Sequence, residues 1–192
     1  MQRAVSLLDE MIEVGVDIQD AKAFNTVMYL ITESRTEIVY KRVIDIHERM
    51  QKAGVPEDIY TLHNIVRACG RAREQERPDA LNLAMATLGE IRHTNRADAR
   101  TYNLIIRVVG ELLPSRDSKM LDPLLEAIFK LCCDDGHFSI HFRKHVKYLM
   151  SAKEWKKCYE RHLDGSKKEP HQWSRNVGHQ WSHNVGVRAI QK

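Results

Sequence analysis

The chain has 192 residues, of which 43% are apolar and 29% charged, a composition that suffices for one modest hydrophobic core. Its four cysteines form no C-x-x-C pair, which argues against a disulfide scaffold or a zinc ribbon, and no apolar run approaches the ~20 residues of a membrane span. The net charge of +4 is uneven: residues 1–139 hold 18 basic against 22 acidic side chains, and residues 140–192 hold 12 against 4. The basic C-terminal quarter favours an anionic partner such as nucleic acid, and a solvated tail explains it equally well.

Two series of amphipathic helices alternate along the sequence. The first series has apolar residues at i, i+3, i+4 and i+7, the spacing of one helical face. Its members are 24–31, 62–69, 102–109 and 142–149, the last with His145 as a polar exception. The second series covers about 3–14, 39–50, 81–91 and 121–132. A basic amphipathic segment, 153–163, predicts a last helix, and no segment alternates as a strand does.

Each second-series helix is followed by a residue that tolerates a left-handed backbone. These residues are Gly15, Gly54, Asn95 and Gly136, each four positions after an apolar or sulfur residue, and those anchors lie 39, 41 and 41 residues apart. We expect each of them to close its helix. A period of about 40 residues is typical of a helical repeat protein, in which stacked helix pairs build a continuous core.

The period predicts an all-α solenoid of helix–turn–helix repeats. Its expected parts are a partial leading repeat at 1–20, full repeats at 21–58, 59–98 and 99–138, a degenerate repeat at 139–163 and a basic tail at 164–192. The chain starts within a second-series helix, so the leading repeat lacks its first helix. The tail carries HQWSRNVG and HQWSHNVG in tandem, and its composition predicts disorder. Its two tryptophans are available to stack on RNA or to dock on a partner, or they have no role.

Two motifs recur in register over roughly residues 3–150 and resemble those of the pentatricopeptide repeat family. TYNLII (101–106) and AFNTVM (23–28) resemble the opening of that repeat, and ERMQKAGVPED (48–58) and DEMIEVGVDIQD (9–20) resemble its close. The resemblance implies a right-handed α-solenoid that reads single-stranded RNA with a few side chains per repeat. The chain departs from the family pattern in its longer connectors, in His63 and Arg143 where Asn is usual, and in Asn95 where Gly is usual.

The resemblance implies base reading at one position in each first-series helix. That position holds Asn25, His63, Asn103 and Arg143, and its partner at the end of each repeat is Asp20, Asp58, Asp98 or Phe138, or Ser139 if the register slips by one. Asn25 with Asp58 is the uridine-type pair of the family. A carboxamide offers a donor and an acceptor to a base edge, and a carboxylate orients it directly or through water. We expect the four base-reading residues along a single inner wall. The alternative is that Asn25 and Asn103 cap helices or pack between them.

Stacking and cationic residues are expected beside these positions. Three residues before each base-reading position stand Lys22, Tyr60, Arg100 and Ile140. Of these, Tyr60 and Arg100 can stack on a base. Four residues after each stand Tyr29, Arg67, Arg107 and Lys147. We predict that five basic residues line one groove, namely Arg67, Arg71, Arg107, Arg143 and Lys147. The alternative is a set of ordinary exposed helix faces.

These features predict a non-catalytic protein that binds single-stranded RNA. The resemblance implies RNA processing, stabilisation or translation in a mitochondrion or plastid, although no targeting segment is visible. The rival prediction is a scaffold, or a subunit of a large organellar ribonucleoprotein, that binds protein rather than free RNA. The acidic body and the departures at the base-reading positions favour this rival.

No catalytic motif or phosphate-binding loop occurs, so we expect no enzymatic activity, no cofactor, no metal and no membrane partner. A metal site at His137, His141 and His145, which follow Cys132 and Cys133, is the weaker alternative to simple packing of that segment.

Overall fold

The computed structural model describes residues 2–14, 20–34, 36–113 and 118–164, and no strand occurs among them. The first-series helices are α2 (Lys22–Thr32), α4 (Ile59–Cys69), α6 (Ala99–Leu112) and α8 (Ile140–Leu149). The second-series helices are α1 (Gln2–Glu13), α3 (Val39–Lys52), α5 (Arg77–His93), which follows a short 3₁₀ turn at Glu74–Glu76, and α7 (Ser118–Asp134). The described part of the chain is therefore all-α, as the apolar stripes predict.

Side-chain caps start three of the first-series helices. Asp58 accepts the backbone N–H of Thr61 at 2.8 Å, and its own N–H donates to the Thr61 hydroxyl at 3.3 Å. Asp98 and Thr101 repeat this arrangement at the start of α6, and Ser139 accepts the N–H of Phe142 at 3.2 Å at the start of α8. Such caps satisfy N–H groups that have no partner within the helix. The D-x-x-T sequence thus fixes where α4 and α6 begin.

The turns that end α3, α5 and α7 share one backbone conformation. Gly54, Asn95 and Gly136 have φ values of 70°, 55° and 74°. In each turn the next N–H donates to the carbonyl five residues earlier, as in Val55 to Met50 at 3.2 Å, Arg96 to Ile91 at 2.9 Å and His137 to Cys132 at 3.0 Å. This is the left-handed ending predicted from the sequence, and the prediction is confirmed at these three residues. Gly15 lies outside the described residues.

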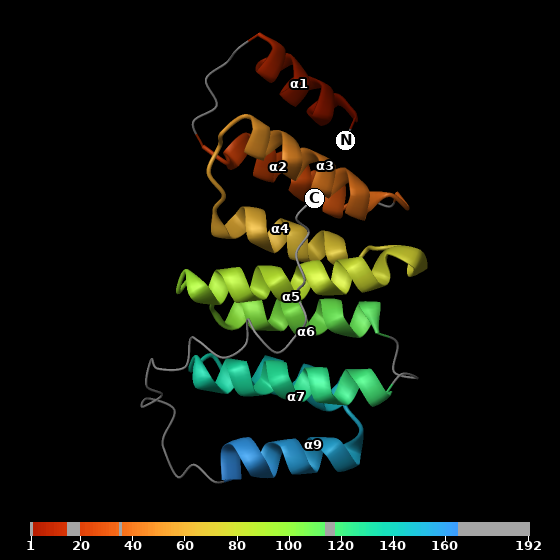
Figure 1. Cartoon of the computed structure of the whole chain (residues 1–192), viewed down its shortest axis with the longest axis vertical. Coiled ribbons are helices and arrows are strands. Elements are labelled where there is room, and N and C mark those ends of the chain that lie inside the picture. The colour runs from red at the N-terminus through yellow and green to blue at the C-terminus, as the bar shows by residue number, and fades with distance from the viewer. Residues whose placement is uncertain (1, 15–19, 35, 114–117, 165–192) are drawn as a thin grey trace.

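The helices lie side by side along the long axis of the molecule, from α1 at one end to α9 (Ala152–Tyr159) at the other (Figure 1). Helices α2, α4, α6 and α8 contact one another in that order. Helix α3 packs on α2 and α4, α5 packs on α4 and α6, and α7 packs on α6. The first-series helices therefore form one continuous layer, in which equivalent residues of successive helices are neighbours.

Two clusters of buried apolar side chains hold this stack together. One joins α1 to α4 around Phe24 and Met28, and the other extends from α4 to α9 around Tyr102 and Phe129. The stripe of α8 is the incomplete one, because only Phe142 and Val146 of that helix are buried and His145 is exposed. A ring that can carry charge is excluded from the core, so α8 buries a narrower face than α4 or α6.

The C-terminal end of the described chain departs from the expected single helix over 153–163. Helix α9 is capped by Ser151, which accepts the N–H of Glu154 at 3.3 Å, and it continues as a π-helical turn at Glu160–Asp164. The predicted tail with its tandem octamer falls almost wholly within 165–192, outside the described residues. Of the helices that the structure describes, none has both the length and the apolar content needed to cross a membrane.

Candidate nucleic-acid interface

The first junction, which we define as Asn25, Asp58 and Thr61, links α2 to the start of α4. The Asn25 Nδ2 donates to Asp58 Oδ1 at 2.9 Å, and the Thr61 hydroxyl donates to Asn25 Oδ1 at 2.8 Å. The same Asp58 oxygen caps α4. The structure therefore brings Asn25 and Asp58, the pair that the family resemblance implies, into direct contact. The half-buried amide is held in one orientation by the helix cap.

The second junction, defined as His63, Asp98 and Thr101, is the equivalent link between α4 and α6. The His63 Nε2 lies 2.9 Å from the Thr101 hydroxyl, which donates its own proton to Asp98 Oδ1 at 2.8 Å. The imidazole is only 5% exposed. Burial lowers the pKa of His63 from its ordinary 6.5, and the charges of Arg100 and Arg67 lower it further against the opposing effect of Asp98. His63 is thus a neutral ring between two helices, and it presents little surface to a ligand.

The third and fourth base-reading positions have no partner of this kind. Asn103 Nδ2 donates to the carbonyl of Ala99 in its own helix at 2.7 Å, and its Oδ1 is buried without a hydrogen-bond partner among the described residues. Phe138, its implied partner, packs instead against Phe129, with ring centroids 5.5 Å apart. Arg143 is exposed, and its guanidinium lies 5.0 Å from the ring centroid of Tyr159.

Three arginines from α4 and α6 form a positive cluster. Burial, followed by the charges of Arg100 and Arg107, lowers the pKa of Arg67, so both of these arginines lie near Arg67. Arg67 lies over the ring of Tyr29, 5.6 Å from its centroid. Acidic groups lie close to these arginines as well, since Glu33 opposes the lowering of the Arg67 pKa and Glu111 lies 3.8 Å from Arg107. The positive charge of the cluster is therefore partly offset.

The other predicted contact residues differ in their exposure and in their hydrogen-bond partners. Tyr60 is 60% exposed and Lys147 is also exposed. Arg71 donates to the carbonyl of Ser34 at 3.1 Å. Asp20 precedes α2 and accepts the backbone N–H of Lys22 at 2.9 Å, so it acts as a local turn acceptor.

Some residues of these junctions are absent from the sequence prediction. Thr61 and Thr101 complete both junctions, and their signal is the D-x-x-T spacing of a capping box. Asn64 is buried and donates to the backbone carbonyl of Asn25 at 3.2 Å. Glu111 lies 3.8 Å from Arg107; burial raises the pKa of its carboxyl, and Arg107 and Arg71 oppose that rise. An acidic group thus interrupts the basic face.

The alternative metal site at His137, His141 and His145 is not assembled in the described part of the chain. Gly136 ends α7 with a left-handed backbone, and the ring of His137 packs against Tyr102 with centroids 6.1 Å apart. His141 and His145 are exposed on α8. The helix break before His137 separates this segment from the upstream cysteines, as the glycine predicts.

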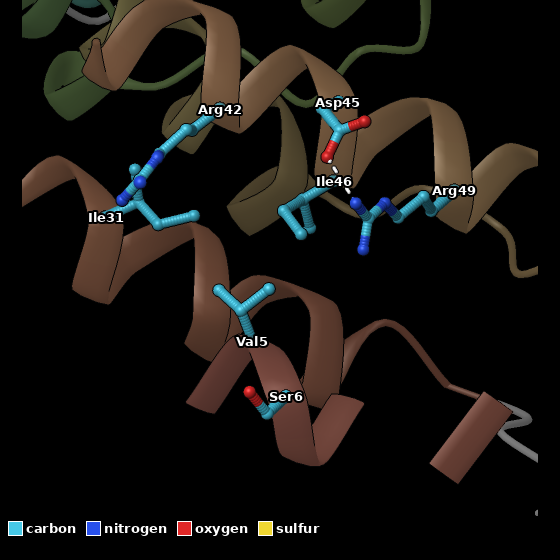
Figure 2. Close-up of a pocket in the computed structure, with 7 residues that line it drawn as sticks. All are labelled: Val5, Ser6, Ile31, Arg42, Asp45, Ile46 and Arg49. Atoms are coloured by element: carbon cyan, nitrogen blue, oxygen red, sulfur yellow. Dashed lines mark ion pairs between the residues drawn. The ribbon is translucent and has the colours of Figure 1, made fainter. Parts of the chain in front are cut away.

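A cavity of about 470 Å³ lies between α1, α2 and α3 (Figure 2). Its lining residues are Val5, Ser6, Ile31, Arg42, Asp45, Ile46 and Arg49. The guanidinium of Arg49 is engaged by Asp45 at 2.8 Å and by Asp9 of α1 at 2.5 Å. These ion pairs tie α1 to α3, and the charge of Arg49 is already matched within the protein.

Two capping junctions and an arginine cluster thus lie on neighbouring first-series helices. Comparison of the chain with protein-family models, with curated proteins and with solved structures gives no match.

Proposed function

We propose that this chain is a right-handed α-solenoid of pentatricopeptide-like repeats that binds single-stranded RNA without catalysis, along the first-series layer. The recurrence of helix pairs with equivalent caps and equivalent left-handed turns supports the repeat architecture. The motif resemblance of residues 3–150 supports the choice of ligand.

The first junction is the observation that carries the proposal. A carboxamide has two N–H donors and an oxygen with two lone pairs. Asn25 uses one donor on Asp58 and one lone pair on Thr61, so one of each remains for a base. The Watson–Crick edge of uracil needs such a donor–acceptor pair, and the fixed amide binds it without losing rotamer freedom. We therefore assign the strongest base preference to Asn25, and that preference is for uridine.

The arginine cluster supplies the contacts that do not depend on sequence. Arg67, Arg100 and Arg107 lie on the helices that follow Asn25 in the layer, and Tyr60 offers an exposed ring for stacking. His63 then has a structural role, because its imidazole bridges α4 and α6. Asn103 keeps one N–H donor, but its Oδ1 is buried, so it offers a base the donor–acceptor pair only after its amide rotates.

Fluorescence anisotropy with short labelled RNAs tests the proposal. We expect the logarithm of the binding constant to fall linearly with the logarithm of salt concentration, with a slope of about 0.7 per phosphate contact. Arg107→Ala should weaken binding roughly equally for U-, A- and C-rich strands, whereas Asn25→Ala should remove the preference for uridine. Lys52→Ala, which removes an exposed cation on α3, is the matched control and should bind as the parent does. Salt-insensitive binding, or identical profiles for Asn25→Ala and Arg107→Ala, would contradict the assigned roles.

The second candidate is a scaffold or a subunit of a large ribonucleoprotein that contacts protein. Two exposed apolar side chains on α8, Ile140 at 63% and Tyr148 at 86% exposure, favour it, because such residues are typical of protein contacts. Glu111 within the basic face points the same way. Purification from cells with one stoichiometric protein partner, together with no affinity for free RNA, would select this function.

The family resemblance also carries the proposed location, a mitochondrion or plastid. Fractionation of cells that express the full natural protein tests it directly. Recovery outside both organelles would remove the organellar part of the proposal and leave RNA binding to be judged by the anisotropy measurements.

A further inference from the structure

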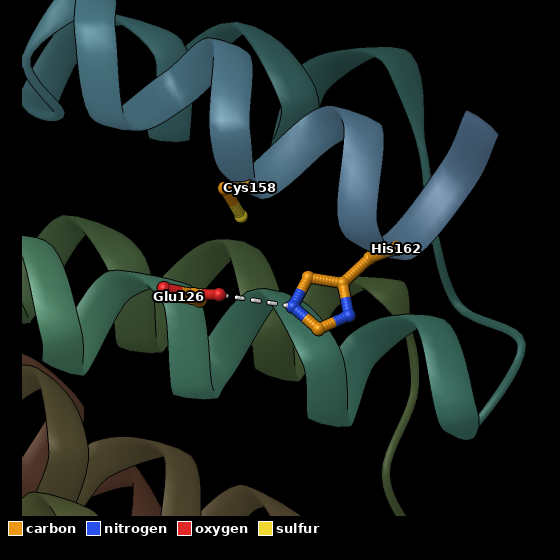
Figure 3. A group of neighbouring side chains, drawn as sticks. All are labelled: Glu126, Cys158 and His162. Atoms are coloured by element: carbon orange, nitrogen blue, oxygen red, sulfur yellow. Dashed lines mark hydrogen bonds and ion pairs between the residues drawn. The ribbon is translucent and has the colours of Figure 1, made fainter. Parts of the chain in front are cut away.

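Three potential metal ligands converge where α7 faces the C-terminal end of the described chain. They are Glu126 of α7, Cys158 of α9 and His162 of the π-helical turn, and one ligand atom from each lies within 4.8 Å of the others (Figure 3). The His162 Nε2 is 3.2 Å from Glu126 Oε1. The thiol of Cys158 is buried, whereas the other two side chains are partly exposed. A cation can thus reach the group from solvent.

The backbone places these side chains on facing surfaces. Cys158 and His162 are four residues apart, so consecutive turns present them on one side of the segment. The turn that carries His162 is π-helical, a widened form that often occurs at functional positions. Figure 3 shows Cys158 and His162 both directed toward Glu126 on the opposite helix. The ligands therefore come from two elements that a bound ion would join.

The donor set matches the preferences of zinc. Zinc is bound by cysteine sulfur, histidine nitrogen and carboxylate oxygen at about 2.0–2.3 Å, which places tetrahedral ligand atoms about 3.3–3.8 Å from one another. The His162–Glu126 separation already falls near this range, and the whole group needs only a small contraction. A thiolate and a carboxylate together would neutralise a divalent cation.

One basic side chain, Arg161, shares this site with the three ligands. Arg161 also binds Glu126 Oε1, at 2.5 Å. Glu126 has a second carboxylate oxygen, so it can coordinate an ion through one oxygen while Arg161 holds the other, as partners of metal-bound carboxylates commonly do.

We propose that Glu126, Cys158 and His162 form a zinc site with its fourth position open to water. Binding releases the thiol proton of Cys158 to solvent and replaces the His162–Glu126 hydrogen bond with two metal–ligand bonds. The Nε2 proton of that hydrogen bond moves to Nδ1 by exchange with water, so that Nε2 is free to coordinate the ion. The ion fastens α9 and the π-helical turn to α7. The site departs from the sequence-based expectation of no metal, and it does not depend on RNA binding.

Cobalt(II) titration of the metal-free full chain tests this site, because cobalt reports thiolate ligation through near-ultraviolet charge-transfer absorption. We expect that band to saturate at one equivalent and to disappear when zinc is added. The band requires a thiolate ligand, so histidines elsewhere cannot produce it alone. The tail has histidines but no cysteine, because the four cysteines are residues 69, 132, 133 and 158. Cys158→Ala should abolish it, and His162→Ala should weaken cobalt binding at least tenfold.

Cys69→Ala is the matched control, since Cys69 is an equally buried thiol on α4. It should keep the band, and circular dichroism of each variant verifies that the helices are intact. Zinc should also raise the melting temperature of the parent chain but not that of Cys158→Ala. Absence of the band in the parent, or its survival in a folded Cys158→Ala variant, would overturn the proposal.

Discussion

The two junctions between first-series helices use the same D-x-x-T cap. The side chains that bond to these caps, Asn25 and His63, have different surroundings. At the first junction the Asn25 amide stays half-buried, whereas at the second the His63 ring is sealed between helices. Helix α4 is packed by α2, α3, α5 and α6, while α2 contacts only α1, α3 and α4 among the closely packed elements. An equivalent position in the sequence is therefore left half-buried or sealed between helices according to how completely its helix is enclosed.

The largest expected effect comes from removing the side chain that bonds to each cap, which is His63 or Asn25. His63→Ala should lower the free energy of unfolding by about 2–3 kcal/mol, because it opens a cavity and removes the hydrogen bond between His63 and the buried Thr101 hydroxyl. Asn25→Ala should cost about 1 kcal/mol, since water can replace the amide. Urea denaturation measures both, with the exposed His141→Ala as control. A larger loss for Asn25→Ala than for His63→Ala would reverse the assignment of the two junctions.

The turns that lead into the two junctions provide a second, smaller contrast. Gly54→Ala should cost about 1 kcal/mol, because its φ of 70° strains any side chain although no atom lies near the added Cβ. Asn95→Gly should stabilise the chain by a few tenths of a kcal/mol by relieving the same strain. The control is Gly89→Ala inside α5, where the added Cβ also meets nothing, and it should gain about 0.5–1 kcal/mol. Equal effects of Gly54→Ala and Gly89→Ala would argue against a left-handed turn.

The smallest expected effect concerns a single proton at the second junction. The pKa of His63 is lower in the folded chain than its ordinary value of 6.5, so the unfolded chain binds more protons as the pH falls. The contribution of His63 is complete above pH 6.5 and is lost as the pH falls toward the folded pKa. The charged groups that face the ring are Asp98, Arg100 and Arg67. The pKa of Asp98 is also lowered, so its own contribution falls only in the range below 3.8.

His63→Gln should therefore flatten the dependence of the urea midpoint on pH just below 6.5, while Asn25→Ala should leave that dependence unchanged. Measurement of both midpoints across this range is sufficient. An unchanged slope in His63→Gln would assign the titration to another histidine.

Local signals in the sequence account for most of the helical framework. The stripes locate the helices, Gly54, Asn95 and Gly136 end them as predicted, and Asp58 and Asp98 start them. These signals are reliable because each depends on atoms within about six residues along the chain. The pentatricopeptide resemblance places Asn25 opposite Asp58, and the structure contains that contact.

Features that depend on the enclosure of a helix could not be predicted in the same way. The burial of His63 follows from the packing of four helices on α4, which no local pattern encodes. Asn103 bonds to its own helix. The residue equivalent to Asp58 is Ser139, which caps α8, while the implied partner Phe138 joins an aromatic cluster. The group at Glu126 joins residues more than thirty positions apart, and only the i, i+4 spacing of Cys158 and His162 is visible in the sequence.

The left-handed turns after α3, α5 and α7 also bear on how such a chain can change in length. Each turn is closed by its own backbone bonds, and the turn after α7 also has contacts from Arg92 and Tyr102 to Asp135. The residues that begin and end the helices of a pair lie within the pair itself, so they stay together when a gene segment is copied or lost. Variation in the number of pairs is then restrained mainly by the apolar seams between neighbours, so relatives of this chain are expected to differ by whole pairs more readily than by partial ones.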